Sequence, residues 1–363
     1  MTTQQNILDK AVGGTFLSHE EANFLYLQAG DGELMEAADR IRNRLHPGNT
    51  VTWIIDRNVN ITNVCVSFCK FCNFCRRGQD EDAYITTIEQ YREKIDRLFE
   101  LGGRQLLLQG GMHPTLGLDF YTGLFRNLKE EYPALMLHAL GPPEIVHLSR
   151  LEKTDFETVL RSLRDAGLDS LPGAGAEILV DRVRRIVSKG KCSAEEWLEV
   201  MRVAHRTGLP TSATMMFGHA ETREERIEHI LRIRDLQAEK PTGSYGFLNF
   251  VPWPFMDEGT ALRDEMGIRN NVDTRQYIRL LSMARILLPN VSHIQASWLT
   301  TGITAGQICL HAGADDFGSV MIEENVVSQA GARNSMDSTG MQAAIVEAGF
   351  VPRKRNQLFE LID

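Results

Sequence analysis

The sequence of 363 residues has no apolar stretch long enough to span a bilayer, which takes about 20 residues. Residues 1–14 lack the basic start and the apolar block of a secretory signal. Cysteine is scarce, with six residues in all, yet four of them lie between Cys65 and Cys75. We therefore predict a cytoplasmic protein without a membrane span, in which crowded thiols favour metal binding or redox chemistry over disulfides.

Positive charge is scarcer than negative charge, with 39 Lys and Arg residues against 48 Asp and Glu and a formal net charge of −9. Nucleic-acid binding needs clustered lysine and arginine, so this balance predicts no nucleic-acid partner. The local exception is a basic run made of Arg182, Arg184, Arg185, Lys189 and Lys191. We interpret this run as the solvated face of a helix.

No Pro-, Ser- or Gly-rich linker divides the chain. Short apolar runs typical of buried parallel strands alternate with amphipathic helical stretches. The expected strands are 53–56 continuing toward 60–64, 105–109, 135–140, 170–173, 211–217, 245–251, 293–297 and 316–320. Eight strand–helix units in series predict an α/β fold of the (β/α)8 TIM-barrel type, with an open doubly wound sheet as the alternative.

The sequence also predicts what lies before and after the strand–helix units. Residues 1–50 are expected to form an N-terminal helical extension, in which Ser18 and Glu21 have the spacing of a capping box. The barrel is expected over residues 51–335, with a C-terminal helix and tail, residues 336–363, packing on it. Chemistry in such barrels lies at the carboxyl ends of the strands. Glycine-rich or polar segments fall at those ends, at 109–111, 138–143, 173–175, 218–219, 249–254 and 295–298.

Cys65, Cys69 and Cys72 form a C-x3-C-x2-C motif on a loop after the first expected strand. Thiolates are soft ligands that suit iron–sulfur clusters and zinc. Three cysteines hold three corners of a four-iron cluster and leave the fourth iron free to chelate S-adenosylmethionine (SAM). The motif, with the aromatic Phe71 between its last two ligands, therefore predicts a [4Fe-4S] cluster and S-adenosyl-L-methionine as cofactors.

Two other sites would use some of the same cysteines. A four-cysteine zinc site would add Cys75, but such sites usually pair two couples across a long spacer, and no second couple is present. A ferredoxin-like cluster would use Cys69, Cys72 and Cys75, but the Cys-Pro that should follow is absent. The corresponding alternative functions are a non-enzymatic iron–sulfur carrier and a zinc-stabilised binding module.

Residues after two of the expected strands are candidates for contacts with SAM. Gly110 and Gly111 would let the backbone approach the methionyl group closely. Glu177 could accept hydrogen bonds from a ribose, although a carboxylate that satisfies a helix N-terminus is an equal alternative.

From about Arg57 to the C-terminus, the chain resembles the radical SAM enzymes of the futalosine route to menaquinone. One shared motif is Gln105-Leu-Leu-Leu-Gln-Gly-Gly-Met-His-Pro114. The other segments that carry the resemblance are 57–65, 141–147, 172–182, 214–222, 294–298 and 321–326. The cysteine motif alone identifies only the superfamily, whereas the whole set is more specific and is similar to the cyclases of that route. The resemblance adds Arg182 to the expected cofactor contacts.

The resemblance implies a cyclase that removes a hydrogen from ribose C4′ of dehypoxanthine futalosine and closes a ring onto the benzoate. It also implies an electron donor such as flavodoxin or ferredoxin. Sister enzymes, of the aminodeoxyfutalosine synthase or deazaflavin FO synthase type, share the barrel and the cluster and remain alternatives. The chain departs from the family pattern at Cys75, where an aromatic such as Tyr is expected, and we expect this thiol to be a bystander.

Polar side chains at the expected barrel mouth are candidates for acid–base chemistry. They are His138, Glu144, His219 and Glu221. A histidine there can act near neutral pH, although each of the four could instead hold a loop or cap a helix.

Candidates for substrate binding lie at the last two strands of the expected barrel. Gln295 and Ser297 share one face of a strand because side chains alternate with a period of two. Glu323 and Asn325 follow the last strand and could bind substrate hydroxyls.

Overall fold

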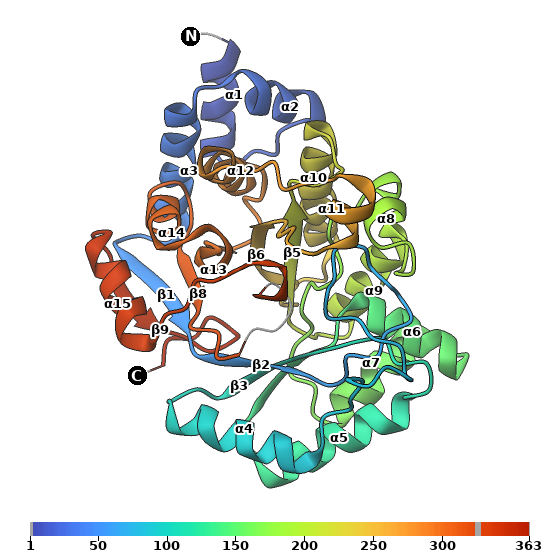
Figure 1. The fold of residues 1–363 in the computed structure, drawn as a ribbon. Coiled ribbons are helices and arrows are strands. Elements are labelled where there is room, and N and C mark those ends of the chain that lie inside the picture. Colours follow the sequence, from blue (N-terminus) through green and yellow to red (C-terminus); the bar gives the residue numbers. More distant parts are fainter. Residues whose placement is uncertain (1–2, 324–327, 363) are drawn as a thin grey trace.

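A ring of parallel strands forms the centre of the molecule, and helices surround it (Figure 1). The computed structural model describes residues 3–323 and 328–362. The strands in these residues are β1 (Thr50–Ile54), β2 (Asp56–Asn60), β3 (Gln105–Gln109), β4 (Met136–Ala139), β5 (Thr211–Phe217), β6 (Phe247–Pro254), β7 (His293–Ile294), β8 (Asp316–Ser319) and β9 (Val351–Lys354).

The helices were expected between the strands, and the structure places most of them there. They are α1 (Thr3–Val12), α2 (His19–Gln28), α3 (Asp31–Leu45), α4 (Ile88–Glu100), α5 (Leu118–Glu131), α6 (Pro142–Glu152), α7 (Phe156–Asp165), α8 (Asp181–Val187), α9 (Ala194–Arg206), α10 (Arg223–Glu239), α11 (Ala261–Met266), α12 (Thr274–Leu287), α13 (Trp298–Thr301), α14 (Ile303–Leu310) and α15 (Ser338–Glu347), with a 3-10 turn at Ser328–Ala330. Among the described residues, no helix combines the length and the apolar character needed to cross a membrane.

Backbone pairing closes the ring of strands. The sheets β2–β3–β4 and β5–β6–β7 are parallel, and bridges from residues 170–171 to β4 and β5 join them. A bridge from Gln295 to Asp316 joins the end of β7 to β8, and β8 pairs in parallel with β1, which leads directly into β2. β1 with β2 thus acts as the first barrel strand and residues 170–171 as the fourth. The predicted (β/α)8 barrel is confirmed, and the open doubly wound sheet is excluded.

Strand β6 extends beyond its predicted end. The sequence predicts that this strand ends at residue 251, whereas β6 continues to Pro254. Pairing of β6 with β7 ends at Phe250, while Pro252 and Pro254 still lie opposite β5. A proline cannot donate to a sheet ladder, so it is tolerated where no neighbouring strand needs its N–H group. The extension places Trp253 on the cavity wall instead of on a loop.

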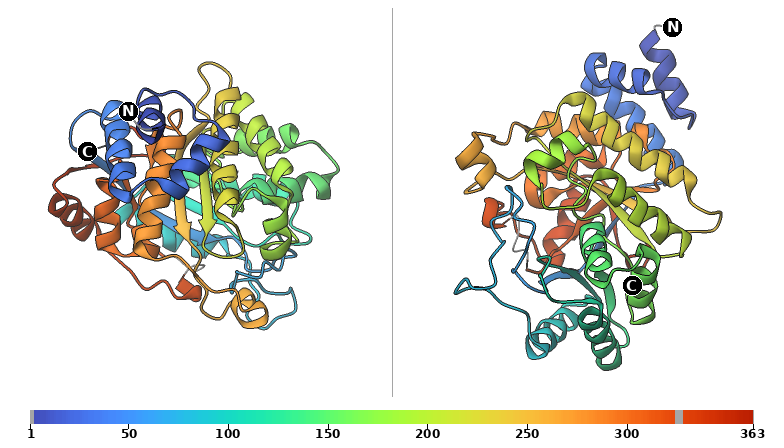
Figure 2. Two further views of the ribbon diagram at one scale, coloured as in Figure 1. Left: turned by 90° about the horizontal axis from the view of Figure 1, so that it is seen from above. Right: turned by 90° about the vertical axis from the view of Figure 1, so that its right-hand side faces the viewer.

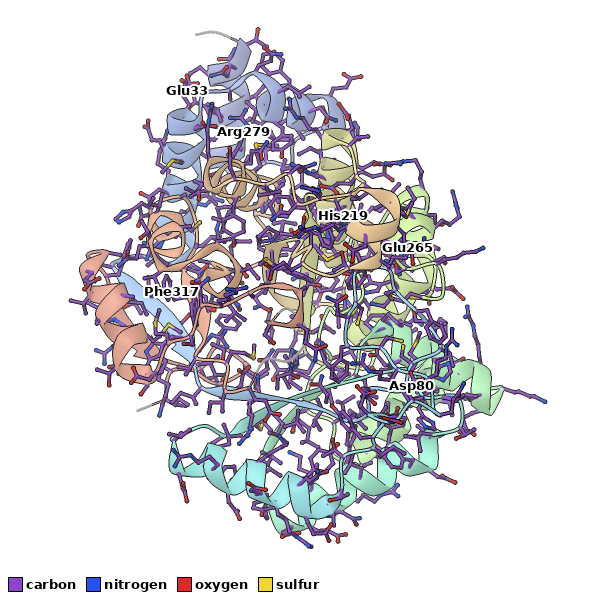
Figure 3. The ribbon with its side chains drawn as sticks, in the orientation of Figure 1. Glu33, Asp80, His219, Glu265, Arg279 and Phe317 are labelled. Carbon is purple, nitrogen blue, oxygen red and sulfur yellow. The ribbon has the colours of Figure 1, made fainter. Side chains whose placement is uncertain are left out.

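The N-terminal helices α1–α3 pack against α10 and α12 on the outside of the barrel (Figure 2). Arg279 of α12 lies below them (Figure 3). Its guanidinium donates to the Tyr26 carbonyl oxygen near the end of α2 at 2.6 Å and pairs with Asp31 at 2.5 Å. The last carbonyls of a helix lack helical partners, so a cation is a favourable cap. The predicted capping box is present, because the backbone and side chain of Ser18 and Glu21 bond reciprocally at 2.7 and 3.1 Å.

The C-terminal segment reaches the floor of the barrel, which we define as the amino ends of its strands. β9 pairs in parallel with β1, from Thr50 opposite Val351 to Trp53 opposite Lys354. The next residue, Arg355, is buried and forms two hydrogen bonds of 2.6 and 2.9 Å to the Asp316 carboxylate of β8. The tail therefore adds a strand that the sequence analysis does not predict.

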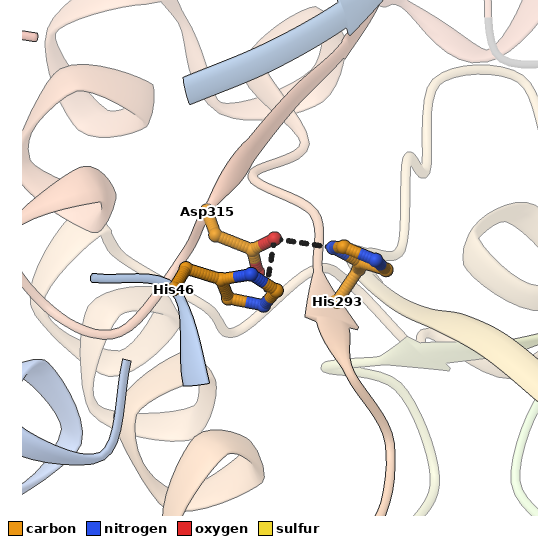
Figure 4. A group of neighbouring side chains, drawn as sticks. All are labelled: His46, His293 and Asp315. Atoms are coloured by element: carbon orange, nitrogen blue, oxygen red, sulfur yellow. Dashed lines mark hydrogen bonds and ion pairs between the residues drawn. The ribbon is translucent and has the colours of Figure 1, made fainter. Parts of the chain in front are cut away.

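A polar cluster ties the end of α3 to the barrel floor (Figure 4). His293 Nδ1 donates to Asp315 Oδ2 at 2.6 Å, and His46 Nε2 lies 3.3 Å from the same oxygen. The other oxygen of Asp315 pairs with the fully buried Arg285 at 2.5 Å. Burial alone would raise the pKa of Asp315, but Arg285 and the two imidazoles hold that pKa well below its usual range. The cluster is therefore anchored by a carboxylate that stays ionised.

Two imidazoles and a carboxylate at this spacing resemble a metal site. However, His46 Nε2 lies 2.7 Å from the Ser292 carbonyl oxygen, which can only accept, so this nitrogen carries a hydrogen. Arg285 also neutralises the carboxylate charge that would attract a cation. The cluster is thus explained as an ion-pair clamp.

Asp315→Asn is expected to lower the free energy of unfolding by about 3–5 kcal/mol, because it leaves the buried Arg285 charged and unpaired. Chemical denaturation of the purified protein measures this change. The matched control is Glu131→Gln, which breaks the exposed pair with Arg92 and should cost less than about 1 kcal/mol. Equal losses in the two variants would argue against the clamp.

Candidate active site

A cavity of about 370 Å3 runs through the barrel, from the floor at Arg355 and Gln357 to the loops after the carboxyl ends of the strands. Most of the predicted site residues line it. They are Cys65, Cys69, Phe71, Cys72, Gly110, Gly111, His138, Glu144, Glu177, Gln295 and Ser297. Residues from five separate stretches of sequence are thus brought to one space, as the strand–helix pattern predicts for a barrel.

The three motif cysteines lie on one loop after β2. Backbone hydrogen bonds hold this loop, from Cys65 N–H to the Arg76 carbonyl oxygen at 3.1 Å and from Val66 N–H to that of Met112 at 3.0 Å. A tight turn follows, in which Cys72 N–H donates to the Cys69 carbonyl oxygen at 3.1 Å. All three cysteines line the same cavity, which is what a cluster with three protein ligands requires.

Burial controls the ionisation of these thiols. It raises the pKa of Cys69 to about 12 and also raises the pKa of Cys72. Cys65 differs, because its interaction with the neighbouring Cys75 thiol lowers its pKa to about 6. Thiols that resist ionisation become thiolates when a metal ion supplies positive charge.

Cys75 is a fourth thiol beside the motif. It lines the same cavity, and its Sγ donates to the Cys65 carbonyl oxygen at 3.4 Å. Cys75 therefore lies close enough to Cys65 to be tested as a fourth ligand, and its role as a bystander stays a prediction.

Gly110 and Gly111 line the cavity, and packing against the chain before and within the cysteine loop also requires that they have no side chain. A Cβ on Gly111 would lie 2.1 Å from the Val64 carbonyl oxygen and 2.9 Å from the Cβ of Cys65. A Cβ on Gly110 would lie 3.0 Å from the Thr62 carbonyl oxygen. The two glycines therefore let the end of β3 pack directly against the cysteine loop. Their contact with SAM stays a prediction.

Glu177 and Lys191 form a largely buried ion pair on the cavity wall, with Nζ 2.8 Å from Oε1. Glu177 has a φ of 45°, a conformation that is strained for a residue with a side chain and is concentrated at functional sites. Burial alone would lower the pKa of Lys191, but Cys69 and Glu177 raise it above its usual value. Lys191 also lies 5.1 Å above the ring of Phe71. A fixed charge pair thus stands beside the cysteine loop.

Glu144 and His138 are the acid–base candidates that reach the cavity. Glu144 Oε2 is buried without a hydrogen-bond partner among the described residues, and burial raises the Glu144 pKa to about 7. His138 Nδ1 lies 2.7 Å from Ser170 Oγ, and burial followed by the charge of Arg355 lowers the His138 pKa to about 3. Near neutral pH Glu144 can therefore exchange a proton, whereas His138 stays neutral.

His219, which is labelled in Figure 3, and Glu221 lie in the turn between β5 and α10, outside the cavity lining formed by the described residues. Glu221 accepts a hydrogen bond of 2.8 Å from Arg226. His219 Nε2 donates to the Met216 carbonyl oxygen at 3.0 Å, and Nδ1 accepts from Ala220 N–H at 2.7 Å, so the ring is neutral. These bonds favour the alternative interpretation, in which both residues hold a loop.

The remaining predicted residues are not among those that line the cavity in the described part of the chain. Arg182 is exposed and pairs with Glu225 of α10, with Nε 2.7 Å from Oε1. Glu323 pairs with Arg57 at 2.7 Å and with Lys94 at 2.6 Å, outside the lining formed by the described residues. Asn325 lies outside the described residues.

The interpretation of the basic run as a solvated helix face is wrong for Arg184 and Lys191. Arg184 is buried and donates to the carbonyl oxygens of Ala176 and Cys192, each at 2.7 Å. A signal for this burial existed, because Val183 and Val187 stand four residues apart and mark the inner face beside which Arg184 lies. No motif pointed to Arg355 or Gln357, which also line the cavity.

The lining fits the cofactors that the cysteine motif predicts. Three thiols from one loop leave one corner of a four-iron cluster without a protein ligand. The Glu177 carboxylate offers an acceptor for the amino or hydroxyl groups of SAM, and the unpartnered Glu144 oxygen offers a proton acceptor in the same cavity. The zinc alternative would need the fourth thiol, Cys75, as a ligand.

Comparison with known proteins agrees with the cofactors that the cysteine motif predicts. A model of the radical SAM superfamily matches residues 59–233, and a model of the CofH/MqnC C-terminal region matches residues 244–363. The cyclic dehypoxanthine futalosine synthase of Streptomyces coelicolor is 42% identical over 98% of this chain and 88% of its own length. The enzyme of that name from Halalkalibacterium halodurans is 38% identical over 98% and 94%. An aminodeoxyfutalosine synthase of Thermus thermophilus is 36% identical over 97% and 94%.

Among solved structures, methylornithine synthase (PylB) is similar with a TM-score of 0.71 at 21% identity, covering 95% of this chain and 97% of that one. This likeness supports the barrel fold alone. The cysteine loop, the barrel and the sequence relatives together place the chain in the radical SAM superfamily, in the family that includes the cyclic dehypoxanthine futalosine synthases.

Proposed function

We propose that this enzyme converts dehypoxanthine futalosine to cyclic dehypoxanthinyl futalosine in menaquinone biosynthesis. A hydrogen atom passes from ribose C4′ to the 5′-deoxyadenosyl radical, and the resulting carbon radical adds to the benzoate ring. Loss of one electron to an electron carrier and of one proton to a base then restores aromaticity. The observation that carries the proposal is the continuous cavity that joins three cysteine thiols to a polar barrel interior. Relatives of that name at 42% and 38% identity support the choice of substrate.

The cluster and SAM, when bound, supply the reducing electron and the 5′-deoxyadenosyl radical for this reaction. Cys65, Cys69 and Cys72 would hold the cluster, and Glu177, fixed by Lys191, would bind hydroxyl or amino groups of SAM. Gln295 and Ser297 would donate to or accept from the substrate. An electron carrier such as flavodoxin or ferredoxin is the proposed partner.

We propose that Glu144 is the base that accepts the proton lost from the benzoate ring. The cyclisation rate is expected to rise with pH through about 7, because the carboxylate form that accepts the proton is populated above the Glu144 pKa. Glu144→Gln should lower the rate by about 100-fold or more and remove this pH step. Single-turnover rates across mildly acidic to mildly alkaline pH measure both effects. His138→Gln is the matched control and should keep the step; a step that survives in Glu144→Gln would exclude Glu144 as the base.

The proposed reaction is tested by incubating the reduced enzyme with SAM and dehypoxanthine futalosine without oxygen. Mass spectrometry should detect the cyclised product together with methionine and 5′-deoxyadenosine. The substrate of aminodeoxyfutalosine synthase serves as the comparison. Turnover of that substrate without any cyclised futalosine product would reject the proposal in favour of the sister activity.

A further inference from the structure

The interior of this barrel is polar down to its floor. Barrels of this type usually fill their interior with branched apolar side chains in layers. Here Asp56 and Asn58 of β2 line the cavity, as do Gln105 of β3 and Asn249 of β6. The registers Asp56 opposite Gln105 and Asn58 opposite Leu107 put these side chains in the lower layers, below the strand ends that lead to the cysteine loop. The floor is therefore a chamber and not a packed core.

Several amide groups of this floor have unused hydrogen-bonding capacity. Asn58 Oδ1, Gln105 Oε1 and Asn249 Oδ1 are buried without a partner among the described residues. The three residues are at most 5% exposed. A buried polar atom without a partner destabilises the protein, so an occupant that bonds to these groups is favoured. The neighbouring Gln105 Nε2 is already used, because it donates to Gln357 Oε1 of the C-terminal tail at 3.0 Å.

The charges on the floor do not suit an anion. The Arg355 guanidinium is taken by the Asp316 carboxylate, at 2.6 and 2.9 Å. Lys191, the other lysine or arginine in the described part of the lining, lies near the cysteine loop and is paired with Glu177. Asp56 adds a carboxyl group to the floor and is bonded to Ser319. Neutral groups that both donate and accept, such as hydroxyls, match this environment, whereas a carboxylate finds no open cation.

We propose that the barrel floor is the sugar subsite of the substrate chamber. Asn58, Gln105 and Asn249, with Gln357 from the tail, hold the ring hydroxyls of the substrate. The benzoate carboxylate then points away from the floor, toward the mouth. This inference rests on the proposed function, since it divides dehypoxanthine futalosine into a hydroxyl-rich end and an anionic end. It also makes the C-terminal tail part of the binding site.

The test compares two probes by anaerobic isothermal titration calorimetry on the holoenzyme. One probe is dehypoxanthine futalosine, and the other is 3-propanoylbenzoate, which lacks the sugar. In Gln357→Leu and in Asn249→Leu, the Kd of the full substrate is expected to rise about tenfold, as for the loss of one or two hydrogen bonds. The Kd of the benzoate probe should change less than about twofold. Gln342→Leu, an exposed change on α15, is the matched control and should leave both unchanged.

Each outcome decides a different point. A loss of affinity for the benzoate probe equal to that for the substrate would place the carboxylate end at the floor and overturn the proposal. Unchanged substrate affinity in both folded variants, judged by wild-type iron content and SAM binding, would also overturn it. Asn249→Leu carries the test if Gln357→Leu does not fold. Wild-type enzyme that binds no dehypoxanthine futalosine would instead reject the proposed function itself.

Discussion

Cys69→Ala is expected to yield a folded protein that retains no iron–sulfur cluster and forms no cyclised product. Cys69 is 8% exposed, and its Sγ lies 3.1 Å from Ser67 Oγ in a loop held by backbone hydrogen bonds. A cluster needs a thiolate at this corner, and alanine supplies no ligand. Iron and sulfide content per chain, together with visible absorbance after anaerobic reconstitution, measure the loss. Circular dichroism should show the wild-type fold.

The matched control is Cys75→Ala, which removes the neighbouring thiol. This variant is expected to keep the wild-type iron and sulfide content and to cleave SAM, because Cys75 lies outside the C-x3-C-x2-C spacing. Loss of the cluster in Cys75→Ala would mean that four thiolates saturate the metal. SAM would then have no open iron to bind, and the proposed chemistry would have no starting point.

Gly111→Ala is expected to lower kcat/KM by about 100-fold or more, since a misplacement of about 1 Å can cost that much in rate. The added Cβ would lie 2.1 Å from the Val64 carbonyl oxygen and 2.6 Å from the Val64 carbonyl carbon. Both are backbone atoms and cannot rotate away, so either the end of β3 or the cysteine loop must shift. Steady-state kinetics and iron content of the purified variant measure the consequence.

The control for this change is Gly123→Ala on α5, where an added Cβ meets nothing within 4 Å. Alanine is favoured over glycine in a helix by about 0.5–1 kcal/mol, so this variant should be slightly more stable and fully active. Wild-type kinetics in Gly111→Ala would show that the contact with Val64 does not position the cysteine loop.

The barrel and the cysteine site could be predicted because their signals are local. Strand periodicity marked the eight units, and the spacing of Cys65, Cys69 and Cys72 marked the ligands within a few residues. The same rule located Glu144 and Glu177, which follow strands and reach the cavity. These predictions need no knowledge of how distant segments pack.

The rest depends on packing that no local pattern reports. His219 and Glu221 also follow a strand, but in their turn His219 bonds to backbone groups and Glu221 bonds to Arg226, outside the cavity lining formed by the described residues. Lys191 lies in a basic run whose spacing suggests a solvated helix face, yet its ammonium group reaches Glu177. Gln357 meets Gln105 across 252 residues of sequence. Such contacts arise only when the ring of strands has closed.

The pairing of β9 with β1 has a consequence for how the molecule is made. Val351 lies opposite Thr50, so one edge of β1 stays unpaired until β9, about 300 residues later in the sequence, has been made. Ribosomes deliver the amino-terminal segments first, and contacts between remote segments form slowly. The floor of the barrel is therefore completed only after residues 351–354 have left the ribosome, so the cysteine loop and the floor can form at separate times.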